Sequence, residues 1–135
     1  MSVLAPETSG WPAIPAGWQR AAFWAWIAGM ATVAVFSLSP GLGPPEAHGI
    51  DKIFHCTGYF VLALQTQPSF STRRAALIAA LCMIPFGIGM EIGQEFVPGR
   101  SADPYDALAN SIGALAGVAV APLFRRIAAA LVARL

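Results

Sequence analysis

The sequence predicts an all-α integral membrane protein, a four-helix bundle with an outward-facing polar pocket. Three observations predict this fold. Only 11% of the 135 residues are charged and 56% are hydrophobic, whereas a soluble domain has about 25% charged residues. Long apolar segments recur along the chain. Four of the seven acidic residues gather in one stretch between two such segments, residues 91–110. Carboxylates are costly beside lipid-length helices, so this clustering indicates a site.

The composition also limits the partners. A net charge of +1 predicts no nucleic-acid partner, and the apolar segments predict contact with membrane lipid. The two cysteines, Cys56 and Cys82, lie within apolar segments and indicate no disulfide framework.

The expected organisation is a cytoplasmic tail, residues 1–19, followed by one membrane domain, residues 20–135. The tail is polar and rich in proline. Two readings stay open for it: Trp11 and Trp18 lie near the lipid headgroups, or the segment is a disordered leader. Residues 21–38 form a charge-free run of 18, which is about 27 Å long as a helix. The run exceeds a typical signal-peptide core and no clear cleavage site follows it, so we interpret it as an uncleaved first span.

Prolines and glycines predict a loop over residues 39–50, where His48 is expected in solvent. Asp51 is expected at the N-cap or in the first turn of a second helix, which runs to about residues 67–68. Polar side chains occupy the first half of this short helix. It must therefore be buried against neighbouring helices.

A turn over residues 68–74 precedes a third span, residues 75–96, in which Pro85 predicts a kink. A tight loop over residues 97–105 leads to the fourth span, residues 106–124. The rest of the chain is expected to be a basic amphipathic tail. Gly113 and Gly117 form a G-x-x-x-G pair, which serves close packing either within one chain or between chains.

The arginines and lysines predict the orientation. If the spans alternate, six of the eight fall on one side, which the positive-inside rule makes the cytoplasm. Both termini are then cytoplasmic, and the loops 39–50 and 97–105 face outward. Lys52 and Arg100 are the two exceptions, and we expect them to pair with nearby carboxylates.

Helical rise places polar groups from three helices at one depth. His55 lies four residues below Asp51, Asn110 lies four below Asp106, and Glu91 lies five below the end of its span, each roughly 6–8 Å. If these side chains face one another rather than lipid, most of the free-energy cost of placing them in the membrane is removed. The candidate ligand-binding residues are Asp51, Lys52, His55, Tyr59, Glu91, Gln94, Glu95, Arg100, Asp103, Asp106 and Asn110.

These residues resemble the signature of the VanZ-like family of small bacterial membrane proteins. The resemblance covers about residues 48–120 and rests on Asp51-Lys52 with His55 and Tyr59, Glu91 with Gln94, Pro98-Gly99-Arg100, and Asp103, Asp106, Asn110 and Gly113. It implies four helices in the bacterial inner membrane. The founding member is associated with resistance to the glycopeptide antibiotic teicoplanin. The resemblance implies no reaction mechanism.

Several kinds of chemistry stay open for this cluster. Five acidic and two basic residues give it a formal charge of −3. A metal ion would relieve that charge, with His55, Glu91 and Asp106 as candidate ligands, although no compact metal signature is present and the cofactor stays unknown. Acid–base catalysis by Glu91 and His55 is a second reading. Anion binding by Arg100 and Lys52, with Tyr59 and Tyr105 lining a groove, is a third. Structural ion pairs, Lys52 with Asp106 or Arg100 with Glu91, are a fourth.

The sequence therefore predicts recognition of an amphiphilic cell-envelope molecule, a lipid-linked precursor or a lipoglycopeptide such as teicoplanin, in the outer leaflet. The alternative is a membrane-embedded hydrolase or transferase acting on such a molecule, with or without a metal. Whether the protein is an enzyme, and its oligomeric state, stay open.

Overall fold

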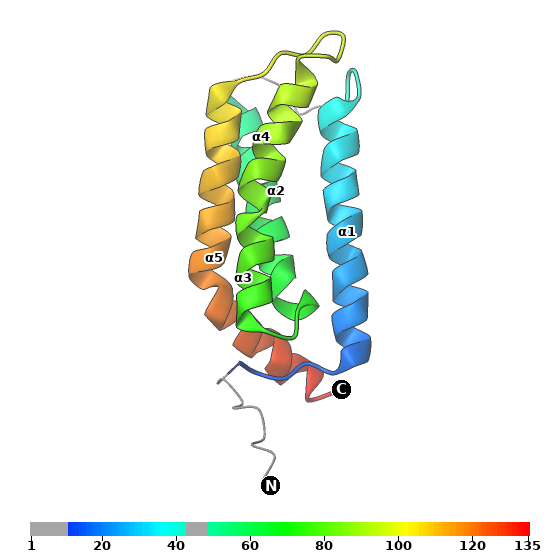
Figure 1. Ribbon diagram of the computed structural model, residues 1–135, viewed down its shortest axis with the longest axis vertical. Helices are drawn as coiled ribbons and strands as arrows, with labels where there is room; N and C mark the ends of the chain where they lie inside the picture. The colour runs from blue at the N-terminus through cyan, green and yellow to red at the C-terminus, as the bar shows by residue number, and fades with distance from the viewer. Residues whose placement is uncertain (1–10, 43–48) are drawn as a thin grey trace, which may run out of the picture.

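The computed structural model describes residues 11–42 and 49–135, so the expectations for residues 1–10 and for His48 lie outside it. The described residues form five helices and no strand. The helices are α1 (Ala16–Leu38), α2 (Ile50–Ser69), α3 (Arg73–Leu81), α4 (Met83–Gln94) and α5 (Pro104–Val132). Figure 1 shows α4 continuing α3 end to end, so that the five helices make the four columns of a bundle. The all-α, four-helix prediction is confirmed.

Three segments are long and apolar enough to cross a membrane: Ala16–Leu38, Arg73–Gln94 and Pro104–Val132. Large hydrophobic side chains are exposed along them, among them Trp24, Ile92 and Leu123. Such exposure is expected of surfaces that contact lipid rather than water. The protein is therefore an integral membrane protein. Helix α1 begins at Ala16, before the predicted apolar run, so the last residues of the expected tail are helical.

Helix α2 lies among the others and packs most extensively against α5. Its core residues Tyr59, Leu62 and Ala63 are buried. This contact explains how a helix with a polar first half is accommodated, because its polar side chains face other helices. Helix α2 begins after Gly49, which has a left-handed φ of 77°, and Asp51 lies in its first turn.

The predicted interruption near Pro85 is present. Helix α3 ends at Leu81 and α4 begins at Met83, two residues before Pro85. Pro85 has no backbone N–H, so it cannot bond the carbonyl of Leu81. The chain bridges the gap through Cys82, whose N–H donates to Ile78 and whose carbonyl accepts from Phe86.

The G-x-x-x-G pair packs within the chain. A Cβ on Gly113 would lie 2.0 Å from the carbonyl oxygen of Cys56, and one on Gly117 would lie 2.7 Å from Cβ of Ala63. Both contacts are on α2. The two glycines therefore allow α5 to approach the backbone of α2, which places the polar ends of the two helices next to each other.

The helix of the fourth span is longer than the span predicted from the sequence. Helix α5 continues past Phe124 to Val132, with Pro122 inside it, and its red C-terminal part turns across the end of the bundle (Figure 1). Arg125 is only 1% exposed. It donates to the carbonyls of Gln67, Phe70 and Pro12. Carbonyls at the end of α2 lack helical partners, and the guanidinium supplies donors for them. Trp11, expected among headgroups, lies with its ring 5.0 Å from this guanidinium.

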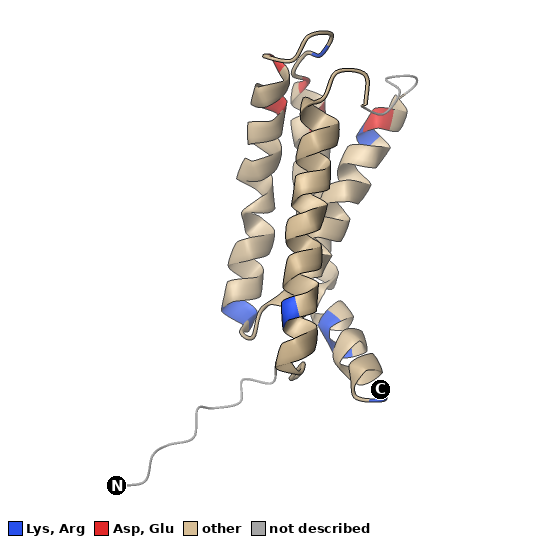
Figure 2. Cartoon of the chain, turned by 90° about the vertical axis from the view of Figure 1, so that its right-hand side faces the viewer, with Lys and Arg blue, Asp and Glu red and all other residues tan. Residues whose placement is uncertain are grey.

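Charges are separated along the bundle. Figure 2 shows the acidic residues at one end and most arginines at the other. The C-terminal end of α1 and the loop between α4 and α5 lie at the same end of the bundle (Figure 1). Two cations also lie near these carboxylates, Lys52 in α2 and Arg100 in the loop before α5.

Candidate functional site

The acidic end is organised around the ammonium of Lys52. Its Nζ lies 2.9 Å from Asp51, 2.8 Å from Asp103 and 2.9 Å from Asp106. Lys52 and Asp51 stand in the first turn of α2. Asp103 is the N-cap of α5, where its Oδ1 accepts from the N–H of Tyr105. The ammonium and this N–H lower the pKa of the Asp103 carboxyl.

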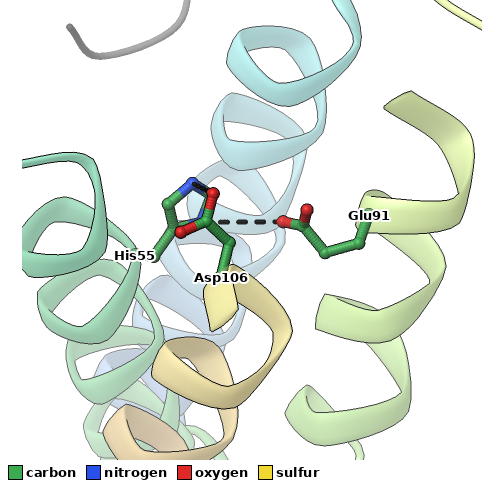
Figure 3. Close-up of side chains that lie close together, drawn as sticks. All are labelled: His55, Glu91 and Asp106. Carbon is green, nitrogen blue, oxygen red and sulfur yellow. Dashed lines mark ion pairs between the residues drawn. The ribbon is translucent and has the colours of Figure 1, made fainter. Parts of the chain in front are cut away.

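His55 joins this group to Glu91 and Asn110. Its Nδ1 lies 3.1 Å from Oδ1 of Asn110 and 3.9 Å from Oε1 of Glu91, and its Nε2 lies 3.6 Å from Oδ2 of Asp106. In Figure 3 His55 from α2, Glu91 from α4 and Asp106 from α5 point toward one another. Residues from three helices therefore meet at one depth, as their helical spacing predicts.

The two carboxylates beside His55 are held in the same way. Asp106 directs Oδ1 to Lys52 and Oδ2 to His55. Glu91 accepts from the N–H of Asp103 with Oε2, at 3.3 Å. Its other oxygen, Oε1, is buried and accepts no hydrogen bond within the described residues. Each carboxylate thus has one anchored oxygen and one oxygen turned to the histidine.

Tyr59 and Gly87 lie next to this group. Tyr59 is 2% exposed, and its hydroxyl has no partner among the residues described. A Cβ on Gly87 would lie 2.9 Å from the Tyr59 ring and 3.0 Å from Cβ of Asn110. Because Gly87 has no side chain, Tyr59 of α2 and Asn110 of α5 can pack directly against α4. The glycine-rich stretch of α4 indicates such a close approach in the sequence.

Arg100 does not form the expected ion pair. Its Nη2 donates to the carbonyl of Phe36 in α1, at 2.8 Å, and over residues 11–42 and 49–135 it makes no salt bridge. The loop turns at Gly99, whose φ is 78°, and this directs Arg100 to α1. Glu95 also stands apart, because it is exposed and accepts from the N–H of Ala102.

Two adjoining cavities surround these residues. A polar cavity of about 250 Å³ is lined by Gly49, Asp51, Lys52, His55, Gln94, Arg100, Ser101, Asp103 and Asp106. A mostly apolar cavity of about 100 Å³ is lined by Val33, Phe36, Ser37, Phe54, His55, Gly58, Tyr59, Gln94 and Arg100. Their walls share His55, Gln94 and Arg100. Of the predicted residues, Glu91 and Asn110 line neither cavity but contact His55, which lines both. Glu95 lines neither cavity.

Sequence reasoning missed the apolar wall. Val33 and Phe36 in α1, and Phe54 and Gly58 in α2, belong to it. Apolar residues in an apolar helix give no signal that separates a cavity wall from a lipid-facing surface. Tyr105, expected in a groove, is instead 69% exposed and lines neither cavity.

The cluster offers the ligand atoms that a cation needs. One nitrogen of His55 and one carboxylate oxygen each of Glu91 and Asp106 lie within 4.8 Å of one another. Imidazole nitrogen and carboxylate oxygen are ordinary ligands of divalent transition metals. The same groups can accept or donate a proton, and the adjoining cavity gives a small molecule access to them.

A comparison with known protein families decides the relationship. A model of the VanZ/LLP1 family matches residues 13–125. The chain belongs to the VanZ/LLP1 family. The VanZ/LLP1 match includes every residue of the cluster and both cavities, and it confirms the resemblance found in the sequence. No curated protein and no solved structure matched the chain.

Proposed function

We propose that this VanZ/LLP1 protein recognises an amphiphilic cell-envelope molecule, a lipid-linked precursor or a lipoglycopeptide such as teicoplanin. One observation supports this function above others: the polar and the apolar cavity share His55, Gln94 and Arg100 as a common wall. A molecule with a polar head and a hydrocarbon tail has the same two parts in the same order. A water-soluble metabolite would have no use for the apolar half.

The location of the apolar cavity fits a lipid tail. Its wall includes Phe36 in α1 and Phe54 in α2, and both side chains are also exposed on the lipid-facing surface of the bundle. A tail can therefore enter sideways from the bilayer without crossing water. The polar head then meets Arg100, whose Nε has no hydrogen-bond partner within the described residues, and the carboxylates beyond it.

The proposed site lies in the outer leaflet of the bacterial inner membrane, with both termini in the cytoplasm. The support is the distribution of arginines. Figure 2 shows most arginines at the end opposite the acidic residues. Six of the eight basic residues belong to the helix ends and turns on that side: Arg20, Arg73, Arg74, Arg125, Arg126 and Arg134. The positive-inside rule assigns that end to the cytoplasm. Cysteine-labelling of single-cysteine variants in the two outer loops, using a membrane-impermeant reagent on intact cells, tests this orientation.

A pair of glycine variants tests the binding proposal. Gly58 lines the apolar cavity, and a Cβ added to it meets no atom within 4 Å. Gly58→Leu therefore adds a side chain to the cavity wall with no clash at its Cβ. Gly89 in α4 also has open space at its Cβ and lines neither cavity, so Gly89→Leu is a matched control. Binding of teicoplanin and of a lipid-linked cell-wall precursor is measured on purified protein by native mass spectrometry.

We expect the wild-type protein and Gly89→Leu to retain at least one of these amphiphiles, and Gly58→Leu to lose it. Equal retention by all three proteins would show that the tail does not occupy this cavity. Absence of binding by wild-type protein to both classes of amphiphile would refute the proposed function.

The alternative is hydrolysis or group transfer on the same kind of molecule. The observation that favours it is the unpaired Oε1 of Glu91 next to His55, because a buried carboxylate oxygen without a hydrogen-bond partner is placed to accept a proton from an attacking water. The test is incubation of a lipid-linked precursor with the protein and analysis of products. Under this alternative Glu91→Gln abolishes product formation and retains binding; under pure recognition no product forms with either protein.

A further inference from the structure

We propose that His55, Glu91 and Asp106 bind one divalent transition-metal ion at the inner wall of the polar cavity. The three residues come from α2, α4 and α5, and they point toward one another (Figure 3). One ligand atom from each lies within 4.8 Å of the other two. Ligands of an ion at about 2.0–2.2 Å lie roughly 3–3.5 Å from one another, so small side-chain movements close the site.

The unpaired oxygen of Glu91 is an independent indication of a ligand. Glu91 is 4% exposed, and its Oε1 is buried and has no hydrogen-bond partner within the described residues. Buried carboxylate oxygens are ordinarily paired, because desolvation without a partner is costly. This oxygen faces Nδ1 of His55 at 3.9 Å, too far for a hydrogen bond. A cation bound to this oxygen, to Asp106 and to Nε2 of His55 would satisfy it.

A second group of three carboxylates does not compete for the ion. Asp51, Asp103 and Asp106 also lie close enough to bind a cation. However, the ammonium of Lys52 already lies between them, 2.8–2.9 Å from each. The lysine neutralises part of that group and leaves Oδ2 of Asp106 facing His55.

Asn110 orients the histidine for metal binding. Its Oδ1 lies 3.1 Å from Nδ1 of His55, and an amide oxygen can only accept, so Nδ1 carries the proton. Nε2 is then free to bind a metal and lies 3.6 Å from Oδ2 of Asp106. Histidine ligands usually donate their other ring N–H to such an acceptor, which fixes the tautomer and the ring. The lysine and the N–H of Asp103 hold the two carboxylates in the same manner.

The ligand set indicates the class of ion. One imidazole and two carboxylates suit Zn²⁺ or Mn²⁺ better than Ca²⁺, which takes oxygen ligands. Three protein ligands leave a coordination position open, as in sites that bind a further molecule. His55 and Asp106 line the polar cavity, which supplies a route for the ion.

An ion here would change what the cavity attracts. The carboxylates repel an anionic head group, whereas a divalent cation among them would bind phosphate or carboxylate oxygens directly. This consequence rests on the proposed function, but the ion site itself does not. The two are tested separately, because the metal experiment uses no amphiphile.

The test measures metal binding by purified protein in detergent. Chelator-treated wild-type protein is titrated with Zn²⁺ or Mn²⁺ alone, and bound metal is counted by elemental analysis after gel filtration. We expect one ion per chain for at least one of the two metals. His55→Gln and Glu91→Gln should each weaken binding at least about 10-fold, the lower bound seen even for groups that only support a ligand. Glu95→Gln, which removes a nearby exposed carboxylate outside both cavities, should bind like the wild type.

Thermal melts distinguish lost binding from lost folding. Saturating metal should raise the melting temperature of wild-type protein and Glu95→Gln, because an ion that binds the folded state stabilises it. Without metal, Glu91→Gln should melt no lower than wild type, since a neutral amide replaces a buried carboxylate that has one unpaired oxygen. Added metal should not raise its melting temperature. Wild-type protein that takes up no ion of either kind, or Glu91→Gln and His55→Gln with unchanged uptake, would overturn the assignment.

Discussion

Nζ of Lys52 lies 2.9 Å from Oδ1 of Asp106, although the two residues are 54 positions apart in the chain. The contact joins the first turns of α2 and α5. The same ammonium also bonds Asp51 and Asp103, so one cation allows three carboxylates to occupy a small space. Lys52 thereby determines where the free oxygen of Asp106 points, and its role is to organise the acidic end of the bundle.

Removing this cation is expected to destabilise the protein. In Lys52→Met the three aspartates keep their positions and lose the ammonium between them, so their mutual repulsion is unrelieved. We expect a lower melting temperature in detergent at neutral pH. Lys52→Arg keeps the positive charge, so its melting temperature should fall less than that of Lys52→Met. The interpretation fails if Lys52→Met melts at the wild-type temperature.

The stability of the acidic end should fall at acidic pH. The Lys52 ammonium and the Tyr105 N–H lower the pKa of Asp103 in the folded protein, so this carboxylate stabilises the fold above the ordinary pKa of aspartate. That contribution is lost as the pH falls through the lowered folded pKa, which places the window below about pH 4. Wild-type melting temperatures measured from neutral to acidic pH should show the decline.

Asp103→Asn is a matched control for this pH effect. Asparagine caps a helix about as well as aspartate, so the bond to the N–H of Tyr105 is retained while the charge is removed. The variant should be less stable than wild type near neutral pH and show a shallower decline toward acid. Parallel pH profiles of the two proteins would exclude Asp103 as a source of the decline.

The contact between α2 and α5 should not tolerate a side chain at Gly113. A Cβ there would lie 2.0 Å from the carbonyl oxygen of Cys56, so the helices must separate. We expect Gly113→Ala to lower the free energy of unfolding by about 1–3 kcal/mol or more. Gly89→Ala adds the same methyl group in open space and should be neutral or stabilising. Denaturation in mixed micelles compares the two.

Arg125 should be far more important for stability than its neighbour. It is buried and donates to carbonyls of Gln67, Phe70 and Pro12. Arg125→Met leaves these carbonyls unpaired, including the buried one of Gln67, at a cost of about 1–3 kcal/mol. Arg126 is exposed, and Arg126→Met should change stability by less than about 0.5 kcal/mol. Equal effects of the two substitutions would show that only the net charge of this end is important.

Much of the fold follows from local rules that act along the chain. Charge-free runs of membrane length predict spans, because lipid admits few charges. Pro85 predicts the break between α3 and α4, because a missing N–H leaves a carbonyl unbonded. Helical rise alone brings His55, Glu91 and Asn110 to one depth. These inferences need only the spacing of residues within single helices, and the structure shows all of them.

Contacts between side chains on different helices could not be predicted in this way, because many pairings are compatible with the same spacing within each helix. Arg100 has several carboxylates nearby in sequence, yet a turn at Gly99 leads it to the carbonyl of Phe36. Arg125 resembles a terminal arginine at a membrane surface, yet unbonded carbonyls at the end of α2 draw it inward. The apolar cavity is made of residues indistinguishable from lipid-facing ones. Residue types and their spacing thus establish the membrane fold and the depth of the polar cluster. The packing of α1, α2 and α4 around one another creates the cavity and determines which groups form hydrogen bonds and ion pairs. The cavity and these pairings depend on distances between helices, which the sequence of a single helix does not encode.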